Sequence, residues 1–293
     1  MTTNPTTASV TPVPPVDVSS FGAYTTLQLK WAAPQVLNVH ISVGKYNAMN
    51  QQFWYEMRTL FPKIGQSSEV RAVWITAEGK TFTAGLDLMD HMDSFLTKGS
   101  DDSARRAIHL KPAITAYQDS FSVLESINQP VVVSIQGPCI GGGVDLITAA
   151  DIRYCSEDAY FSVKEVDVGL AADVGTLQRL PKVVANQSLV REWCYTGRKI
   201  TSGEALSSGL VSKVFPNQEA LMKASLAVCV EIAKKSPVAV TGTKVILNYS
   251  RDHSIKDSLD YVALWNASAL QSKDLAAAME FSLTKQQAIF SNL

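Results

Sequence analysis

Cysteine and histidine are scarce in this sequence and never stand at the spacings that metal sites require. Its four cysteines form no CxxC pair, and none of its four histidines lies at ligand spacing from them; the cysteines are Cys139, Cys155, Cys194 and Cys229. Zinc sites and disulfide frameworks both depend on such spacing. The sequence therefore predicts reduced cysteines, mostly in the core, and no metal site.

The chain also lacks an excess of charge of either sign. Its 293 residues carry a formal net charge of −1, with a pI near 6.4, so it offers no basic field for nucleic acid. The longest weakly charged run, residues 131–150, contains Pro138, a glycine run and Asp145. This composition favours a buried strand and helix over a membrane span, so we expect neither a nucleic-acid partner nor a membrane partner.

Basic residues are absent from the start of the chain, where the first is Lys30. Residues 1–20 are rich in Thr, Pro and Ser, which predicts a disordered leader instead of an Arg-rich mitochondrial transit peptide. The last three residues, Ser291-Asn292-Leu293, differ by one residue from the S-K-L peroxisomal address. An ordinary terminus is the alternative interpretation of this tripeptide.

Strand-like and helix-like segments alternate along the first two thirds of the chain, which favours an α/β fold. Apolar stripes at helical spacing occupy residues 50–65 and 114–124, and the strand-like runs lie at residues 37–43, 70–77, 130–137 and 151–156. Further on, Thr201 with Glu204 predicts a capping box, and Ser236-Pro237 predicts a helix start. We expect an α/β core over residues 21–200 and a helical C-terminal region over residues 201–293.

The segment GPCIGGGVDL, residues 137–146, places three consecutive glycines before a predicted helix. A dinucleotide-binding loop needs G-x-G-x-x-G, but Leu146 fills the third glycine position. A phosphate-binding loop needs a Lys and a hydroxyl residue where Gly143 and Val144 stand. Both nucleotide-binding interpretations fail on the residues that contact the phosphates.

A third use of such glycines is an oxyanion hole, in which N–H groups at a helix N-terminus point at a carbonyl oxygen. The segment TFTAGLDLMD, residues 81–90, is a candidate for the second donor, because Ala84 and Gly85 precede a predicted helix start at Asp87. Two ordinary turns are an equally good interpretation of these residues alone.

Three segments together resemble the crotonase, or enoyl-CoA hydratase/isomerase, superfamily. They are GKTFTAGLDL, IQGPCIGGGVDLITAADIRYC and YFSVKEVDVGLAADVGTLQRLP, and the likeness spans nearly all of the chain from about residue 25. Within the superfamily the sequence is most similar to the dienoyl-CoA isomerases. The resemblance implies a spiral of ββα turns and a helical C-terminal oligomerisation region that packs subunits into trimers, with two trimers stacked as a hexamer.

The resemblance also implies which residues bind an acyl-CoA substrate. By position, the backbone N–H groups of Leu86 and Gly142 are the two oxyanion donors, and Ala84 and Gly85 belong to the same substrate-binding segment. It implies no metal and no cofactor, because the coenzyme A thioester is itself the substrate.

Three acidic positions decide which reaction the resemblance implies. Hydratases of the family hold water with two glutamates, at the positions of Asp145 and Glu165, and the shorter Asp145 counts against hydration. Asp173 matches the isomerases that convert 3,5-dienoyl-CoA into 2,4-dienoyl-CoA. We expect Glu165 to act as the base at C2, Asp173 as the acid at C6 and Asp145 to tune the pocket, although the first two roles can be exchanged.

Two other functions remain open on the sequence alone. The nearer is an enoyl-CoA hydratase; the other, from a different class, is an RNA-binding crotonase relative, against which the near-neutral charge argues. With fatty-acid oxidation implied, the final tripeptide favours the peroxisome, and the mitochondrion is the alternative.

Overall fold

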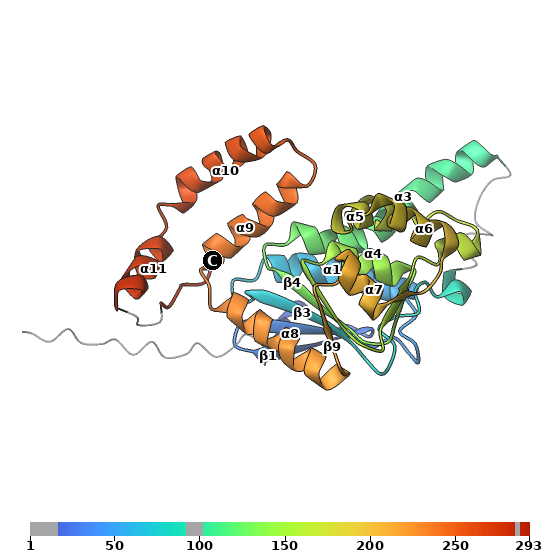
Figure 1. The fold of residues 1–293 in the computed structure, drawn as a ribbon, viewed down its shortest axis with the longest axis horizontal. Coiled ribbons are helices and arrows are strands. Elements are labelled where there is room, and N and C mark those ends of the chain that lie inside the picture. The colour runs from blue at the N-terminus through green and yellow to red at the C-terminus, as the bar shows by residue number, and fades with distance from the viewer. Residues whose placement is uncertain (1–16, 92–101, 285–287) are drawn as a thin grey trace, which may run out of the picture.

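A six-stranded sheet forms the centre of the computed structural model (Figure 1), which describes residues 17–91, 102–284 and 288–293. The strand order is β1-β2-β3-β4-β6-β9; β1 and β2 are antiparallel and every later pair is parallel. The strands are β1 Leu27–Ala33, β2 Val36–Ile41, β3 Ala72–Ala77, β4 Val131–Ile135, β6 Ile152–Ser156 and β9 Lys213–Phe215. Both β3 and β4 are buried along their whole length, as parallel strands covered on both faces are.

A smaller second sheet contains β5 Pro138–Ile140, β7 Tyr160–Ser162 and β8 Ile200–Thr201. Single parallel bridges join Thr83 to Cys139 and Met49 to Leu86, and so extend this layer. Successive passes of the chain each add one strand to the large sheet and one short extended segment to the small layer before a helix. The predicted spiral of ββα turns is confirmed.

Helices cover both faces of the large sheet. The face with Val73 and Ile75 packs against α1 Gln51–Gly65 and α3 Ser103–Ser126, and the face with Trp74 packs against α8 Gln218–Ala233. The predicted stripe of α1 is buried there through Phe53, Met57, Leu60 and Ile64. Of the stripe predicted on α3, Phe121 and Leu124 are buried but Ile114 and Tyr117 are only half-buried, since α3 has no buried residue before Ser120. The shorter helices are η1 Val18–Phe21, α4 Gly142–Ala149, η2 Glu165–Val168, α5 Thr176–Val183, α6 Gln187–Thr196 and α7 Ser202–Ser208.

The large sheet continues beyond residue 200, the expected start of the helical C-terminal region. β9 pairs with β6 through three residue pairs, and α8 packs on β3, β4, β6 and β9. The strand was not anticipated because the three residues KVF are too few to show an alternating pattern. From residue 218 onward every described element is a helix.

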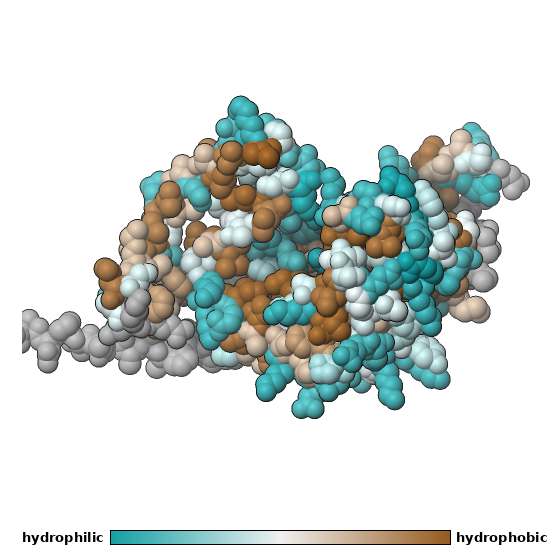
Figure 2. Space-filling model, in the orientation of Figure 1, coloured by the Kyte–Doolittle hydropathy of each residue, from teal (hydrophilic) through white to brown (hydrophobic). Residues whose placement is uncertain are grey.

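The last three helices form an arm beside the core (Figure 1): α9 Pro237–Ser250, α10 Ile255–Ala269 and α11 Lys273–Thr284. The predicted start of α9 is confirmed, since Ser236 caps the helix and Pro237 is its first residue. Large apolar side chains of the arm face solvent (Figure 2), among them Leu247, Ile255, Leu259, Leu264, Met279 and Leu283. In α10 and α11 no described residue is buried.

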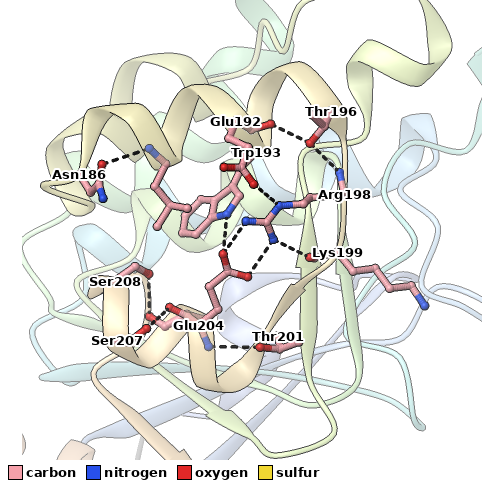
Figure 3. A network of polar contacts seen from close by, with 12 residues as sticks. Asn186, Glu192, Trp193, Thr196, Arg198, Lys199, Thr201, Glu204, Ser207 and Ser208 are labelled. Carbon is pink, nitrogen blue, oxygen red and sulfur yellow. Dashed lines mark hydrogen bonds and ion pairs between the residues drawn. The ribbon is translucent and has the colours of Figure 1, made fainter.

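The predicted capping box at α7 is only half formed (Figure 3). The hydroxyl of Thr201 accepts the N–H of Glu204, but the Glu204 carboxylate turns away from Thr201. It accepts hydrogen bonds from two nitrogens of Arg198, at 2.6 and 2.9 Å, and from the Trp193 indole at 3.1 Å. A charged guanidinium is a stronger partner for a carboxylate than a backbone amide, which accounts for the difference.

The chain contains no described helix both long and apolar enough to cross a bilayer. The weakly charged run at residues 131–150 forms β4, β5 and α4. Residues 1–16 of the expected leader lie outside the described residues. Near the other end, the side chain of Asn292 accepts hydrogen bonds from Gln35 and Arg71 and donates one to Glu69, so it lies against the core.

Glu56 of α1 binds the residues directly before β1 through hydrogen bonds. We predict that Glu56→Gln destabilises the fold. The residue is 2% exposed, and its carboxylate accepts both the N–H and the hydroxyl of Thr25 and of Thr26. Burial alone would raise the pKa of Glu56, but these bonds and one from Gln52 outweigh burial and lower it. This stabilisation is therefore present at pH values above the pKa of Glu56 in the unfolded chain. It is lost as the pH falls through the pKa of Glu56 in the folded protein.

We expect Glu56→Gln to lower the free energy of unfolding by about 1–3 kcal/mol at pH 7, because the amide cannot accept all these donors. Urea unfolding followed by circular dichroism measures the change. Glu157→Gln, at an exposed position, is the matched control. Equal stability of the Glu56 variant and the control would contradict the prediction.

Candidate active site

The first predicted oxyanion donor lies on the extended segment that follows β3. In the bridge to Met49, the hydrogen bonds run from Met49 N–H to Gly85 O at 2.7 Å and from Asp87 N–H to Met49 O at 3.1 Å. Successive N–H groups of an extended chain point to opposite sides, so the N–H of Leu86 points away from Met49. The helix predicted after this segment begins at Leu88, with Asp87 accepting hydrogen bonds from its first turn.

The second predicted donor, the N–H of Gly142, belongs to the first residue of α4. Gly141 is the N-cap, with φ of 53°, and it offers no side chain to cap the helix. Its own N–H donates to Ser162 O at 2.9 Å, which fixes the turn. Because the first N–H groups of a helix have no acceptor within it, the N–H of Gly142 is oriented for an outside acceptor.

Backbone contact brings these two segments together. A Cβ atom built on Gly85 would lie 2.8 Å from the carbonyl oxygen of Ile140, directly before Gly141, and the φ of Gly85 is +85°. Any larger residue at position 85 would separate the segments. The structure thus places the turn at Gly85 and Leu86 against the start of α4.

The other glycines of the run are explained by contacts within the protein. A Cβ on Gly143 would lie 2.4 Å from Cγ2 of Thr83, and a Cβ on Gly142 would lie 3.0 Å from Sδ of Met49. The sequence suggested close approach of a ligand as the reason for three glycines. The structure adds that α4 packs against the small layer too closely for side chains.

Asp145 lies one turn after Gly142 and is 1% exposed. Its Oδ1 accepts the N–H of Thr176 at 2.5 Å, so it caps the N-terminus of α5, where Gly175 offers no side chain. Burial raises the pKa of Asp145 to about 6, against the opposing effects of the Thr176 hydrogen bond and the positive charge of Arg179. One oxygen of this carboxylate is therefore already used for structure.

Glu165, the first residue of η2, places its carboxylate beside the glycine run. A Cβ on Gly141 would lie 3.4 Å from Oε1 of Glu165, and Oε2 is buried without a hydrogen-bond partner among the described residues. Burial, and then the negative charge of Asp145, raise the pKa of Glu165 to about 7. The side chain lines a cavity of about 430 Å³, whose other walls include Val163, Leu170, Ala172, Leu177 and Cys194.

Asp173 lies close to this pair but lines a different cavity. Its negative charge raises the pKa values of both Asp145 and Glu165, and partial burial raises its own. The cavity that it borders has a volume of about 370 Å³ and polar walls, which include Gln118, Ser122, Glu125, Arg179, Lys182 and Arg251. The structure thus brings Asp145 and Glu165 together at the glycine run and places Asp173 at the border of a neighbouring cavity.

The acid and base roles expected from the sequence need a protonated Asp173 and an ionised Glu165. In the substrate-free protein, burial and the charge of Asp145 favour a proton on Glu165, and burial favours one on Asp173 as well. Near neutral pH Glu165 is therefore divided between its protonated and ionised forms, and the pKa of Asp173 is shifted in the direction that a proton donor needs.

Three residues at this site were not predicted from the sequence. Thr176 donates to Asp145, Arg179 affects the charge of that carboxylate, and Cys194, interpreted as core, lines the Glu165 cavity. No local pattern marks them, because each reaches the site from a helix that starts after the acidic positions.

Among the described residues, no three His, Cys, Asp or Glu side chains gather where they could hold a metal.

A ββα spiral with two joined glycine turns and buried carboxylates beside them defines the class of crotonase-fold proteins. An enoyl-CoA hydratase from Bacillus anthracis has this fold, with a TM-score of 0.82 at 23% identity over 91% of this chain and 99% of that structure. Residues 34–290 match the family model described as enoyl-CoA hydratase/isomerase. The chain belongs to the enoyl-CoA hydratase/isomerase family, which confirms the resemblance.

Two relatives narrow the similarity within the family. The chain is 54% identical over 259 residues to the human mitochondrial delta(3,5)-delta(2,4)-dienoyl-CoA isomerase, covering 88% of this chain and 79% of the relative. It is 41% identical over 249 residues to the peroxisomal delta(3,5)-delta(2,4)-dienoyl-CoA isomerase of Arabidopsis thaliana, covering 84% and 89%.

The raised pKa of Glu165 predicts that Glu165→Gln stabilises the protein at alkaline pH. With a folded pKa of about 7, the folded protein binds this proton more tightly than the unfolded chain does. The resulting stability is present below the unfolded pKa and lost as the pH rises through the folded one. The neutral amide of Gln at position 165 has a similar shape and does not ionise, so the variant does not lose this stability.

We expect Glu165→Gln to exceed the wild type in free energy of unfolding by at most about 3 kcal/mol at pH 8, with the gain shrinking toward pH 5. Urea titrations at both pH values measure it, with Glu157→Gln as the exposed control. A gain that is the same at both pH values would rule out the ionised carboxylate as its cause.

Proposed function

We propose that this protein isomerises 3,5-dienoyl-CoA to 2,4-dienoyl-CoA. The observation that carries the proposal is the half-buried Glu165 carboxylate, which lies beside the glycine run with a pKa of about 7 and with one oxygen buried without a hydrogen-bond partner among the described residues. A base with such a pKa is suited to take a proton from carbon at neutral pH. The names of the human and Arabidopsis relatives support the same reaction.

The substrate carbonyl would lie between the two glycine turns. Its oxygen accepts hydrogen bonds from the N–H groups of Leu86 and Gly142, and Ala84 and Gly85 contact the thioester end of the substrate. These donors stabilise the negative charge that develops on the oxygen when C2 loses a proton. One such donor is worth on the order of 100-fold in rate.

The proton steps balance without any other reactant. Glu165 takes a proton from C2, and the resulting dienolate spreads its charge from the thioester oxygen to C6. Asp173 then gives a proton to C6, so the double bonds move from C3 and C5 to C2 and C4. The cycle closes when Asp173 regains a proton and Glu165 loses one, through solvent or through Asp145.

Hydration is disfavoured by the contacts of Asp145. Family hydratases carry a glutamate at this position to hold water, whereas here one oxygen of the shorter Asp145 accepts the N–H of Thr176. The carboxylate is also almost fully buried. Both properties suit a residue that tunes the pKa of Glu165 better than one that binds a reacting water.

No cofactor is needed for this reaction. The substrate gains and loses one proton, and no electrons leave it, so neither a redox group nor an added group donor takes part. The coenzyme A portion belongs to the substrate.

We further propose assembly into a hexamer built from two trimers. The apolar side chains that α9, α10 and α11 expose, such as Leu259 and Leu264, supply contact area that a monomer leaves in water. Multi-angle light scattering of the purified protein measures the mass directly. A monomeric mass would exclude this assembly.

For location, we propose the peroxisome, on the basis of Ser291-Asn292-Leu293. One relative is named peroxisomal and the other mitochondrial, so relatives support both compartments. Imaging of the protein with a fluorescent tag at its N-terminus, compared with Leu293→Asp, tests the proposal. Identical distributions of the two proteins would exclude the tripeptide as the address.

The isomerase proposal predicts growth of 2,4-dienoyl absorbance when the protein meets 3,5-octadienoyl-CoA. We expect Glu165→Gln and Asp173→Asn each to reduce kcat by roughly 100- to 10,000-fold, since each removes a proton-transfer group. Ultraviolet spectroscopy of initial rates measures both. Glu157→Gln and Asp119→Asn are matched controls at exposed positions.

A parallel assay with a 2-enoyl-CoA separates isomerase from hydratase. Loss of enoyl absorbance, without any growth of dienoyl absorbance in the first assay, would assign hydration and overturn the proposal. If only Glu165→Gln is inactive, Asp173 is not the acid at C6.

A further inference from the structure

Arg179 holds the loop that carries Asp173. It lies one turn into α5 and folds its guanidinium back over Gly175: a Cβ on that glycine would lie 1.8 Å from Nη1 of Arg179. The same nitrogen donates to the carbonyl oxygen of Val174 at 3.4 Å. The φ of Gly175 is +136°, a conformation that L side chains rarely adopt, and the guanidinium occupies the space beside its Cα. The Arg179 head group therefore covers residues 174 and 175, directly after Asp173.

One face of α3 fixes both Arg179 and the backbone of Asp173. Oε2 of Glu125 accepts a hydrogen bond from Nε of Arg179 at 2.9 Å and forms an ion pair with Nη2 at 2.8 Å, and Nη2 donates to the hydroxyl of Ser122 at 2.9 Å. Gln118 donates to the carbonyl oxygen of Asp173 at 2.8 Å. Gln118, Ser122 and Glu125 share a face of α3 by their helical spacing.

The same Glu125 carboxylate contacts the C-terminal arm. Nη1 of Arg251, at the end of α9, pairs with Oε1 of Glu125 at 2.5 Å, and Asn248 donates to the Glu125 carbonyl at 3.0 Å. The Arg179 and Glu125 side chains are 12% and 16% exposed. A pair so far removed from solvent is held more firmly than the usual surface ion pair.

We infer that Arg179 is a positioning residue for Asp173 and that Glu125 connects it to the C-terminal arm. The inference rests on the proposed function, in which Asp173 gives a proton to C6. A displacement of about 1 Å of a reacting group costs on the order of 100-fold in rate. The oxyanion donors Leu86 and Gly142 lie on other segments, so loss of Arg179 lowers kcat and leaves KM nearly unchanged.

A lysine at position 179 distinguishes a positioning role of Arg179 from a purely electrostatic one. The positive charge of Arg179 lowers the pKa of Asp145, and a lysine keeps that charge. A lysine lacks the planar fork that bonds Glu125, Ser122 and Val174 together. Arg179→Lys therefore retains the wild-type pH profile but not its kcat, whereas Arg179→Met changes both.

Steady-state kinetics with 3,5-octadienoyl-CoA between about pH 5 and 9 test the inference on purified full-length Arg179→Lys, Arg179→Met and Arg251→Met. We expect kcat to fall on the order of 100-fold in both Arg179 variants, and by less in Arg251→Met because Glu125 still holds Arg179. Arg191→Met, exposed on α6, is the control. Wild-type kcat in Arg179→Lys, or a loss confined to KM, would overturn the inference.

Amide hydrogen exchange gives a readout that does not require activity. Mass spectrometry of the peptide covering residues 169–178 should show faster exchange than in the wild type for both Arg179 variants. The control should exchange at the wild-type rate. If the wild type fails to isomerise the substrate while this exchange difference holds, the proposed function falls and the positioning of the loop stands. Unchanged exchange in both Arg179 variants would exclude positioning, whatever the activity.

Discussion

The contact between two stretches of backbone, at Gly85 and at Ile140 with Gly141, is the constraint on which the candidate site depends. A single Cβ at position 85 would overlap the Ile140 carbonyl. Because the two turns touch, N–H groups from separate passes of the ββα spiral lie near one another. Two bridges of the small sheet layer flank this contact, one at Thr83 and one at Leu86. The large sheet sets the spacing of the passes, and the small layer brings their ends together.

Burial of two carboxylates beside this contact gives the site its chemical character. Taking Asp145 and Glu165 out of water raises both pKa values, and the negative charge of Asp145 raises that of Glu165 further. The N-terminus of α5 partly offsets the cost, since Asp145 accepts the N–H of Thr176 there. The same carboxylate thus caps a helix and tunes its neighbour, which explains why it is buried so completely.

The C-terminal arm reaches the site through polar contacts with the end of α3. Lys244 donates to the Leu124 carbonyl, Asn248 to that of Glu125, and Arg251 pairs with the Glu125 side chain, all from one face of α9. The arm also exposes Leu247 and the apolar residues of α10 and α11. An assembly that covered those residues would fix the arm, and through Glu125 also the loop at Asp173.

The sequence alone determined the class of fold, the buried stripe of α1, the buried end of α3, the helix starts next to Asp87 and at Pro237, and the two glycine turns. These features follow from periodicity and turn chemistry, which act between residues close in the chain. The positions of Asp145, Glu165 and Asp173 came from the resemblance to a family. Only the tertiary structure decided that Asp173 borders a separate polar cavity, that Glu204 binds Arg198, that β9 completes the sheet, and that Arg179 closes over Gly175. Burial, charge and close contact of this kind are set by segments distant in sequence, and no local pattern contains them.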